Sequence, residues 1–322
     1  MQPVMALNAI SPVYGPVSSR RLGRSLGVDL VPFKTCTYDC IYCQLGHTND
    51  QTTRRAGYVD QDWVLAELKM KLEHAPLPNY ISLAGSGEPT LHAGIGELIV
   101  GIKRLTRVPV AVLTNGSLLW DPDVRKALME ADLVMPSLDA GDETTFQQVN
   151  RPHRDIAFDA MVDGLAAFSA QFRRLVWLEV MLVDGINATE REVRKIAALT
   201  RRIRPLRVQL NTVSRPPAEG CARAVPAEQL SRLAQCFGES VEIISDVGSH
   251  DLAGSWDDTV CDTSILALLS RRPCTADGVA AGLGLHIQVA AKRLDALAKI
   301  GAVVVQRRDE KSYYRLRHTP QA

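Results

Sequence analysis

The chain has 322 residues, 46% of them hydrophobic, and its basic and acidic residues nearly balance to give a formal net charge of +1. This length and apolar content are enough for a substantial core and predict two domains. No apolar run is long enough to span a membrane, and Met1 to Leu7 lack the basic, apolar and cleavage regions of a secretory signal. We therefore expect a soluble, cytoplasmic protein.

Short apolar runs alternate with amphipathic segments from the N-terminus to about residue 246. Buried strands are predicted for the runs 25–31, 80–84, 108–113, 133–135, 176–182 and 208–210. Helical spacing lies between them, at 63–72, 97–105, 124–129, 157–168 and 190–202. This repeated βα pattern predicts an α/β fold, with a parallel sheet and helices outside it. It fits a full or partial barrel or an open doubly wound sheet.

The marked polar and cysteine motifs of this region each follow one of the predicted strands. In chain order they are a cysteine loop at 36–43 and the segments 85–90, 114–116 and 136–139. In all of these architectures, functional residues collect in the loops after the C-terminal ends of the strands. The coincidence predicts one functional site at this edge of the sheet.

Three of the seven cysteines, Cys36, Cys40 and Cys43, lie within eight residues in a CxxxCxxC pattern. Three thiolates can each bind one iron of a [4Fe-4S] cluster and leave the fourth iron without a protein ligand. A purely electron-carrying cluster normally has four protein thiolates. The alternatives are a zinc knuckle completed by His47, or unrelated thiols. Clustered thiols and an odd total suit a metal site in a reducing compartment better than disulfides.

The other four cysteines are widely spaced and form no CxxC pair. They are predicted to be structural or incidental: Cys221, Cys236, Cys261 and Cys274. Three basic residues near the cysteine loop, Arg20, Arg21 and Lys34, are candidates for binding an anionic substrate or cofactor carboxylate. Solvation at the surface is an equal alternative for each of them.

The last part of the chain has a different pattern. Turn-forming residues at 247–256 predict a linker. We place a core at 1–246, a linker at 247–261 and a second domain at 262–318. That domain is predicted to contain helices at 264–269, at 276–281 with Thr275 as cap, and from about Ile287 to Lys299. A hairpin of 302–305 and 312–316 follows. Helix, helix-turn-helix and β-wing in this order resemble a winged-helix domain.

Charge is unevenly distributed along the chain. From Asp262 to Ala322 there are ten Lys and Arg against five Asp and Glu, a local charge of +5 that leaves −4 for the rest. A basic C-terminal domain on a mildly acidic body is a weak pointer to nucleic acid, and a solvated charged face explains it equally well.

The segment 15–46, with its CxxxCxxC loop, resembles a largely uncharacterised subfamily of radical S-adenosylmethionine (radical SAM) enzymes. This subfamily is usually grouped with the enzymes of tRNA wybutosine synthesis. The resemblance covers about residues 13 to 246. It implies a partial (βα)6 barrel and an oxygen-sensitive [4Fe-4S] cluster held by the three cysteines. It also implies reductive cleavage of S-adenosylmethionine to a 5′-deoxyadenosyl radical, supported by a flavodoxin- or ferredoxin-like electron donor.

The resemblance also suggests which residues contact S-adenosylmethionine. Tyr42 matches the position whose backbone meets the adenine edge, although ordinary packing beside the cluster is compatible with this. The segment Gly85-Ser86-Gly87-Glu88 resembles the Gly-Gly-Glu-Pro motif of the family, with Ser86 replacing its first Gly. Small residues at a strand end let backbone carbonyls approach the ammonium group of the cofactor, and Glu88 adds negative charge.

Polar residues after the third and fourth strands are further candidates for cofactor binding. Thr114 and Asn115 can meet the methionyl carboxylate or the ribose, as can Ser137 and Asp139. The Asp139 carboxylate can accept two hydrogen bonds from ribose hydroxyls. Turn capping is the alternative for each of these residues, and for Asn115 it is the favoured one. No catalytic residue can be identified from the sequence.

Three functions remain compatible with these motifs. The leading one is a radical SAM enzyme acting on a large substrate, such as RNA, that the winged helix recruits. The second is a maturase or activase of a protein or metallocofactor. An iron–sulfur transcription regulator is the third, and the cofactor-binding loops argue against it. The predicted winged helix lacks an aromatic-rich stacking surface that would favour RNA over protein.

Overall fold

The computed structural model describes residues 11–74, 76–238, 241–244, 261–308 and 311–317. Within them, the main sheet has eight strands in the order β1-β2-β5-β6-β7-β8-β9-β10. β1 is antiparallel to β2, and every other neighbouring pair is parallel. The strands are β1 (Val13–Ser19), β2 (Gly23–Val28), β5 (Tyr80–Leu83), β6 (Val110–Thr114), β7 (Leu133–Pro136), β8 (Leu175–Leu182), β9 (Arg207–Thr212) and β10 (Val241–Ile243).

The predicted α/β class with a parallel sheet is confirmed, and all six predicted strands are present. The edge strands β1 and β10 were not predicted.

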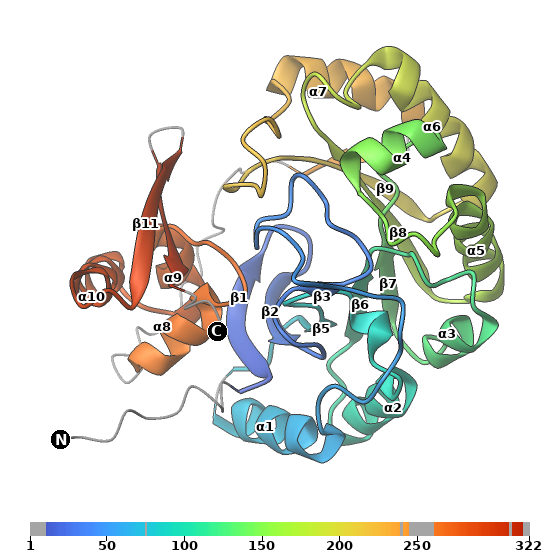
Figure 1. Cartoon of the computed structure of the whole chain (residues 1–322). Coiled ribbons are helices and arrows are strands. Elements are labelled where there is room, and N and C mark those ends of the chain that lie inside the picture. The colour runs from blue at the N-terminus through green and yellow to red at the C-terminus, as the bar shows by residue number, and fades with distance from the viewer. Residues whose placement is uncertain (1–10, 75, 239–240, 245–260, 309–310, 318–322) are drawn as a thin grey trace.

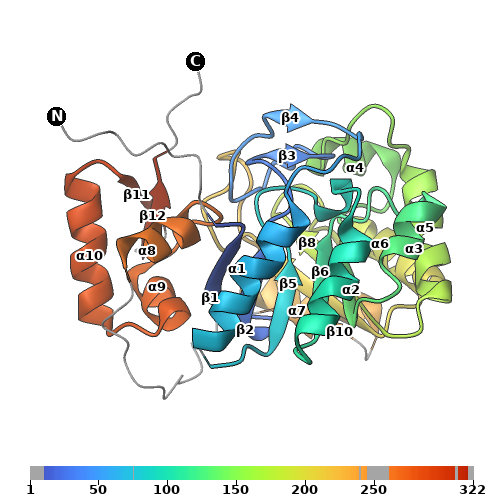
Figure 2. The same ribbon diagram turned by 90° about the horizontal axis from the view of Figure 1, so that it is seen from below.

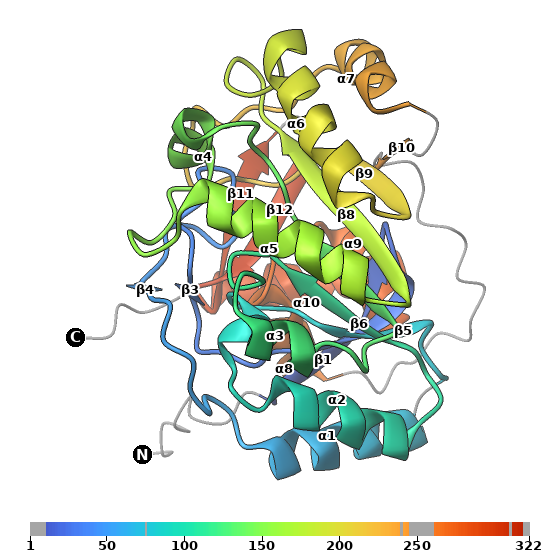
Figure 3. The same cartoon turned by 90° about the vertical axis from the view of Figure 1, so that its right-hand side faces the viewer.

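Helices surround the outer face of this curved sheet (Figure 1). They are α1 (Gln61–His74), α2 (Ile95–Leu105), α3 (Pro122–Ala127), α4 (Glu143–Val149), α5 (Phe158–Gln171), α6 (Glu190–Ile203) and α7 (Ala227–Ala234), with short 3-10 turns at Pro89–Leu91 and Gln235–Phe237. α5 and α6 pack side by side on the outside (Figure 3). α6 begins where the Thr189 side chain accepts a hydrogen bond from the Glu192 amide, which satisfies a free N–H of the first turn.

The two faces of the sheet carry different residues, because side chains alternate along a strand. On β8, Val176, Leu178, Val180 and Leu182 belong to the main core. Trp177 instead packs in a separate cluster with Leu22, Leu133 and Met135. Glu179 lies on that same inner face and forms an ion pair with Arg21. Arg21 is therefore only partly exposed, whereas Arg20 is exposed at the surface.

The C-terminal elements are α8 (Asp262–Leu269), α9 (Ala276–Leu283), α10 (Ile287–Lys299) and the antiparallel pair β11 (Val303–Arg308) and β12 (Lys311–Leu316). The helices and the hairpin agree with the sequence prediction, and Thr275 caps α9 by accepting a hydrogen bond from the Gly278 amide. The predicted linker at 247–256 lies outside the described residues. Figure 2 shows these elements beside β1. Their core, which includes Ile265, Leu268 and Leu294, extends onto Tyr14 and Val17 of β1.

The C-terminal unit contacts the rest of the chain at both ends of the curved sheet. At the β1 side, Arg271 forms a buried ion pair with Asp29, which follows β2. At the other side, the Tyr313 hydroxyl donates to the Ser214 carbonyl at 2.9 Å, and the Arg308 guanidinium donates to the Arg215 carbonyl. Ser214 and Arg215 follow β9, next to the edge strand β10. The unit thus contacts both the β1–β2 edge of the sheet and the loop after β9.

Candidate functional site

The three cysteines of the CxxxCxxC loop are half-buried free thiols after β2. Cys36 ends β3 (Thr35–Cys36), a two-residue strand paired with β4 (Asp50–Gln51). The backbone then turns back on itself, and the Cys43 amide donates to the Cys40 carbonyl at 3.1 Å. Burial raises the pKa of the Cys36 thiol to about 12, and raises that of Cys40 as well, because the thiolate form loses its hydration.

Each cysteine sulfur faces a nitrogen donor from a different part of the chain. The Asn115 side-chain amide is 3.7 Å from Cys36 Sγ, and that of Asn150 is 3.5 Å from Cys40 Sγ. The Lys34 ammonium donates to Cys43 Sγ at 3.2 Å. Hydrogen bonds to cysteine sulfur are a recognised means of setting the reduction potential of an iron–sulfur cluster. Three soft ligands, each with a donor beside it, fit a cluster better than they fit three unrelated thiols.

Lys34 has a strained backbone that the surrounding structure fixes. Its φ is 61°, an uncommon value for a residue with a side chain, and the residue is buried. Its amide donates to the Ser86 carbonyl at 2.8 Å, and its carbonyl accepts from the amides of Asn49 and Asp50. Such strain costs about 1–3 kcal/mol and persists only where neighbouring contacts determine the conformation. This conformation directs the ammonium to Cys43, so Lys34 is not an open site for a substrate anion.

The Gly85–Glu88 loop lies directly against the cysteine loop. A Cβ on Gly87 would lie 1.8 Å from the Thr35 carbonyl oxygen, so only glycine allows this approach. Gly85 has a φ of 154° and packs against the Asp29 carboxylate. That carboxylate accepts hydrogen bonds from the amide and the hydroxyl of Ser86. Contacts within the protein therefore require these glycines, in addition to the predicted approach of the cofactor.

Glu88 joins the second and third strand-end loops. Its buried carboxylate accepts hydrogen bonds from the amide and hydroxyl of Thr90, from the Thr114 hydroxyl at 2.6 Å and from the Asn115 amide at 2.7 Å. Burial raises the pKa of Glu88, and these hydrogen bonds counteract the effect. The arrangement gives Glu88 and Thr114 a positioning role. Direct contact of either with S-adenosylmethionine stays a prediction.

Asp139 connects the fourth strand-end loop to the cysteine loop. Its buried carboxylate accepts hydrogen bonds from the Tyr42 hydroxyl, from the Asn150 amide at 2.7 Å and from the Met181 backbone at 2.9 Å. Burial raises the pKa of this carboxyl group to about 6. Ser137 is half-buried and pairs with Glu179 by a backbone bridge. The structure thus brings Ser86, Gly87, Asn115 and Asp139 into contact with the cysteine loop or with the two residues before Cys36. Contact of Asp139 with ribose stays a prediction.

The zinc alternative is not favoured by these contacts. The imidazole nitrogens of His47 lie 3.1 Å from an Asp39 carboxylate oxygen and 3.6 Å from one of Glu219. Across the described ranges, no three His, Cys, Asp or Glu side chains are grouped as ligands of a single metal ion.

Two contributors to the site escaped the sequence analysis. Asn150, in the loop after α4, contacts both Cys40 and Asp139, but it belongs to no motif. Arg271, from the connection after α8, reaches Asp29 and through it the Ser86 loop. A charged pair buried to this degree is rare, but the sequence offers no signal for which Asp and which Arg will meet.

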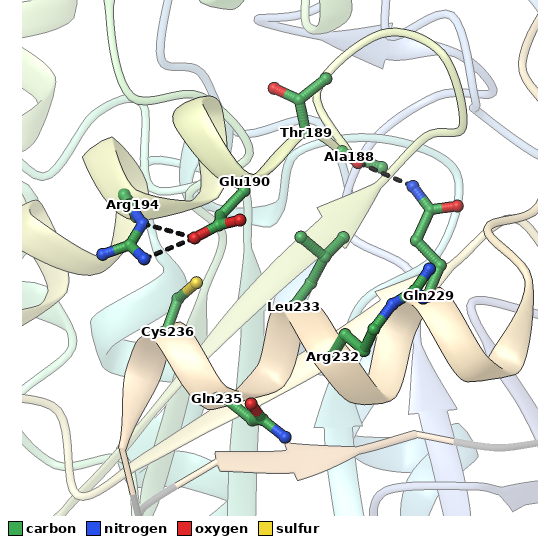
Figure 4. Close-up of a pocket in the computed structure, with 9 residues that line it drawn as sticks. All are labelled: Ala188, Thr189, Glu190, Arg194, Gln229, Arg232, Leu233, Gln235 and Cys236. Atoms are coloured by element: carbon green, nitrogen blue, oxygen red, sulfur yellow. Dashed lines mark hydrogen bonds and ion pairs between the residues drawn. The ribbon is translucent and has the colours of Figure 1, made fainter.

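A hollow of about 820 Å³ lies between the start of α6 and α7, with Cys236 on its wall (Figure 4). Glu190 and Arg194 pair across one side of it, and the Gln229 amide donates to the Ala188 carbonyl on the other. None of its lining residues is among the predicted site residues. This hollow therefore lies outside the proposed site.

Comparison with known proteins connects this geometry to a family. Residues 30–197 match the Radical SAM superfamily. A UPF0026 protein of Helicobacter pylori is 34% identical over 277 residues, which cover 85% of this chain and 88% of that protein. A protein of Brachyspira hyodysenteriae named GTPase Obg is 42% identical over 269 residues. These cover 83% of this chain but only 40% of that protein.

The fold is also found in solved structures. A radical SAM methyltransferase from Sphaerobacter thermophilus aligns with a TM-score of 0.51 at 18% identity, over 68% of this chain and 65% of that one. No helix within the described residues has the length and apolar character needed to cross a membrane. The chain belongs to the radical SAM superfamily and, within it, to the UPF0026 proteins, and it is therefore an enzyme of the class whose cofactors are a [4Fe-4S] cluster and S-adenosylmethionine.

Proposed function

We propose that this enzyme modifies a large substrate and that this substrate is RNA. We also propose that Cys36, Cys40 and Cys43 are the protein ligands of its cluster. The three half-buried thiols, each with a nitrogen donor beside it, are the observation that carries the assignment. We place the protein in the cytoplasm, in the group of the tRNA wybutosine enzymes, with a winged-helix domain from residue 262. A flavodoxin- or ferredoxin-like protein would supply electrons.

When bound, the cluster and S-adenosylmethionine supply the reductive cleavage of a carbon–sulfur bond. The protein holds and orients them. Lys34, Asn115 and Asn150 would donate to the cysteine sulfurs and favour their negative charge. Cofactor contacts are proposed for Tyr42, Gly85, Ser86, Gly87, Glu88, Thr114, Asn115, Ser137 and Asp139. Six of these nine residues already have side chains held by internal hydrogen bonds: Tyr42, Ser86, Glu88, Thr114, Asn115 and Asp139. We infer that the set presents backbone groups and a rigid shape to the cofactor rather than flexible side chains.

Cluster assignment is tested by substitution under anaerobic conditions. Reconstituted protein should bind about four irons and, once reduced, convert S-adenosylmethionine to 5′-deoxyadenosine and methionine. Ala in place of Cys36, Cys40 or Cys43 should abolish both the iron content and the product. The matched controls Cys221→Ala and Cys236→Ala should retain both. A control cysteine that proved necessary for the cluster would refute the three-ligand assignment.

The substrate class is tested separately. Turnover of S-adenosylmethionine by the wild-type enzyme should change when cellular RNA is added, and treatment of that RNA with ribonuclease should remove the effect. The alternative function is a maturase or activase of a protein or metallocofactor. A structural relative solved with a bound precursor peptide, SuiB of Streptococcus suis, shares the fold at a TM-score of 0.52 and 12% identity. Stimulation by a protein fraction after ribonuclease treatment would favour that alternative.

A further inference from the structure

We infer that single-stranded RNA docks by its phosphates in a basic groove between the loop after β9 and the β11 strand of the C-terminal hairpin. The inference rests on the RNA substrate proposed above and specifies where that substrate binds. The groove has a volume of about 410 Å³. One wall is the segment 216–224 and the other is Gln306, Arg307 and Arg308. The two parts of the chain thus build one site that neither contains alone.

Charge is the main property of this groove. Its lining contains the guanidinium groups of Arg223, Arg307 and Arg308 and no acidic side chain. Arg223 and Arg307 are exposed, and across the described residues neither forms an ion pair with a carboxylate. Because a guanidinium presents paired donors that match phosphate oxygens, an uncompensated pair of arginines favours a polyanion.

Contacts that do not involve Arg223 or Arg307 hold the two walls of the groove together. Arg308 donates to the Arg215 carbonyl, and the Tyr313 hydroxyl donates to the Ser214 carbonyl. The hairpin is therefore fixed against the loop, and the two exposed guanidiniums lie on the walls of a preformed groove. A preformed surface loses less entropy on binding than one that must be ordered by its ligand.

The groove adjoins the cysteine loop. Within the segment 216–224 that forms one wall, the Glu219 amide donates to the Ile41 carbonyl at 2.9 Å, and Ile41 lies between Cys40 and Cys43. Arg215 donates to the Gln44 side chain at 3.0 Å, directly after Cys43. A strand bound by its phosphates in the groove would therefore pass beside the proposed cluster. Two of the three basic residues of α10 are less suited to this task, since Lys299 pairs with Asp295 and Arg293 with Asp262.

RNA fits this groove better than an acidic protein segment does, because phosphates recur at every nucleotide and the lining offers arginines from both walls. No aromatic side chain is in the lining, so base stacking is not available there. We therefore expect binding that is governed by phosphate contacts, steeply dependent on salt and weakly dependent on sequence.

The test measures binding of a short fluorescein-labelled single-stranded RNA to the full-length, cluster-loaded chain over a range of salt concentrations. The groove variant is Arg223→Gln with Arg307→Gln. The matched control is Arg104→Gln with Arg107→Gln, two exposed arginines at the end of α2 and just after it. Each phosphate contact to a single strand contributes roughly −0.7 to the logarithmic salt slope. The groove variant should therefore lose about 1.4 from the magnitude of this slope, and the control should match the wild type.

Iron content checks that each variant is folded. A third variant, Arg223→Lys with Arg307→Lys, should keep most of the wild-type slope because it keeps both charges. An unchanged slope in the groove variant, with wild-type RNA binding intact, would overturn the groove and leave the RNA substrate standing. Absence of RNA binding by the wild type would overturn both. Competition by polyglutamate as effective as competition by unlabelled RNA would assign the groove to an acidic protein instead.

Discussion

Removing Arg271 should destabilise the enzyme and loosen its cofactor loop at the same time. The Arg271 Nε lies 3.3 Å from Asp29 Oδ2, and the two side chains are 8% and 7% exposed. The same guanidinium donates to the carbonyls of Ser11 and Ala267 and lies over the Tyr14 ring. Asp29 in turn holds Ser86 by its amide and hydroxyl. The C-terminal unit is thereby connected to the proposed S-adenosylmethionine site.

The size of the expected stability loss follows from the burial of Asp29. In Arg271→Met, Asp29 would remain buried without its cation, a change that typically costs about 3–5 kcal/mol. Burial already raises the pKa of Asp29, and Arg271 opposes that rise. Without Arg271 the pKa of Asp29 in the folded protein rises further above its value in the unfolded chain. The stability loss is therefore absent below the unfolded-state pKa and grows as pH rises through the folded-state pKa. The variant should be less impaired at acidic pH than at pH 8.

The assay is urea unfolding of the cluster-free chain, followed by circular dichroism, together with S-adenosylmethionine affinity of the loaded enzyme. Arg271→Met combined with Asp29→Asn removes both charges and should recover most of the stability, because Asn can still accept from the Ser86 amide. Lys299→Met is the control, since its ion pair with Asp295 is 74% and 62% exposed and is worth about 0–1 kcal/mol. A loss in Arg271→Met no larger than in the control, or no recovery in the double variant, would refute the coupling.

Three further predictions concern single residues. The Lys34→Met variant should still assemble the cluster but with a lower reduction potential, since the cation 3.2 Å from Cys43 Sγ favours the more negative reduced state. A redox titration that gave the same potential for Lys34→Met and for the charge-conserving Lys34→Arg would contradict this. Gly87→Ala should reduce iron content, because its Cβ would lie 1.8 Å from the Thr35 carbonyl and displace the cysteine loop, whereas Gly57→Ala, with no atom within 4 Å, should bind iron normally. Hydrogen bonds from Lys195 and the Thr145 amide lower the pKa of Asp142 to about 2. The Asp142→Asn substitution should therefore reduce the free energy of unfolding by about 0–1 kcal/mol above pH 3.8, and this loss should disappear as pH falls towards 2. Equal losses at pH 7 and pH 2 in chemical denaturation would show that the charge is not the cause.

The sequence alone predicted three candidate cluster ligands and a parallel sheet with helices outside it. Both predictions come from local sequence patterns. The spacing of Cys36, Cys40 and Cys43 places three thiols in one loop, and apolar runs that alternate with amphipathic segments predict the strands. Because the C-terminal ends of parallel strands meet at one edge, the chain order of the motifs also predicted that their loops gather around the cysteines. The edge strands were missed because β1 carries the turn-forming residues of a loop and β10 has only three residues.

Tertiary structure decided which groups support those ligands. Asn150 meets Cys40 across 110 residues, and Arg271 meets Asp29 across 242. No local pattern marks either residue, because a single Asn or Arg has many possible partners until the chain is packed. The same holds for Glu88 and Asp139, whose carboxylates are predicted as cofactor groups but are occupied by internal donors in the structure. Local spacing selects the chemistry, and long-range packing decides which side chains are still available to perform it.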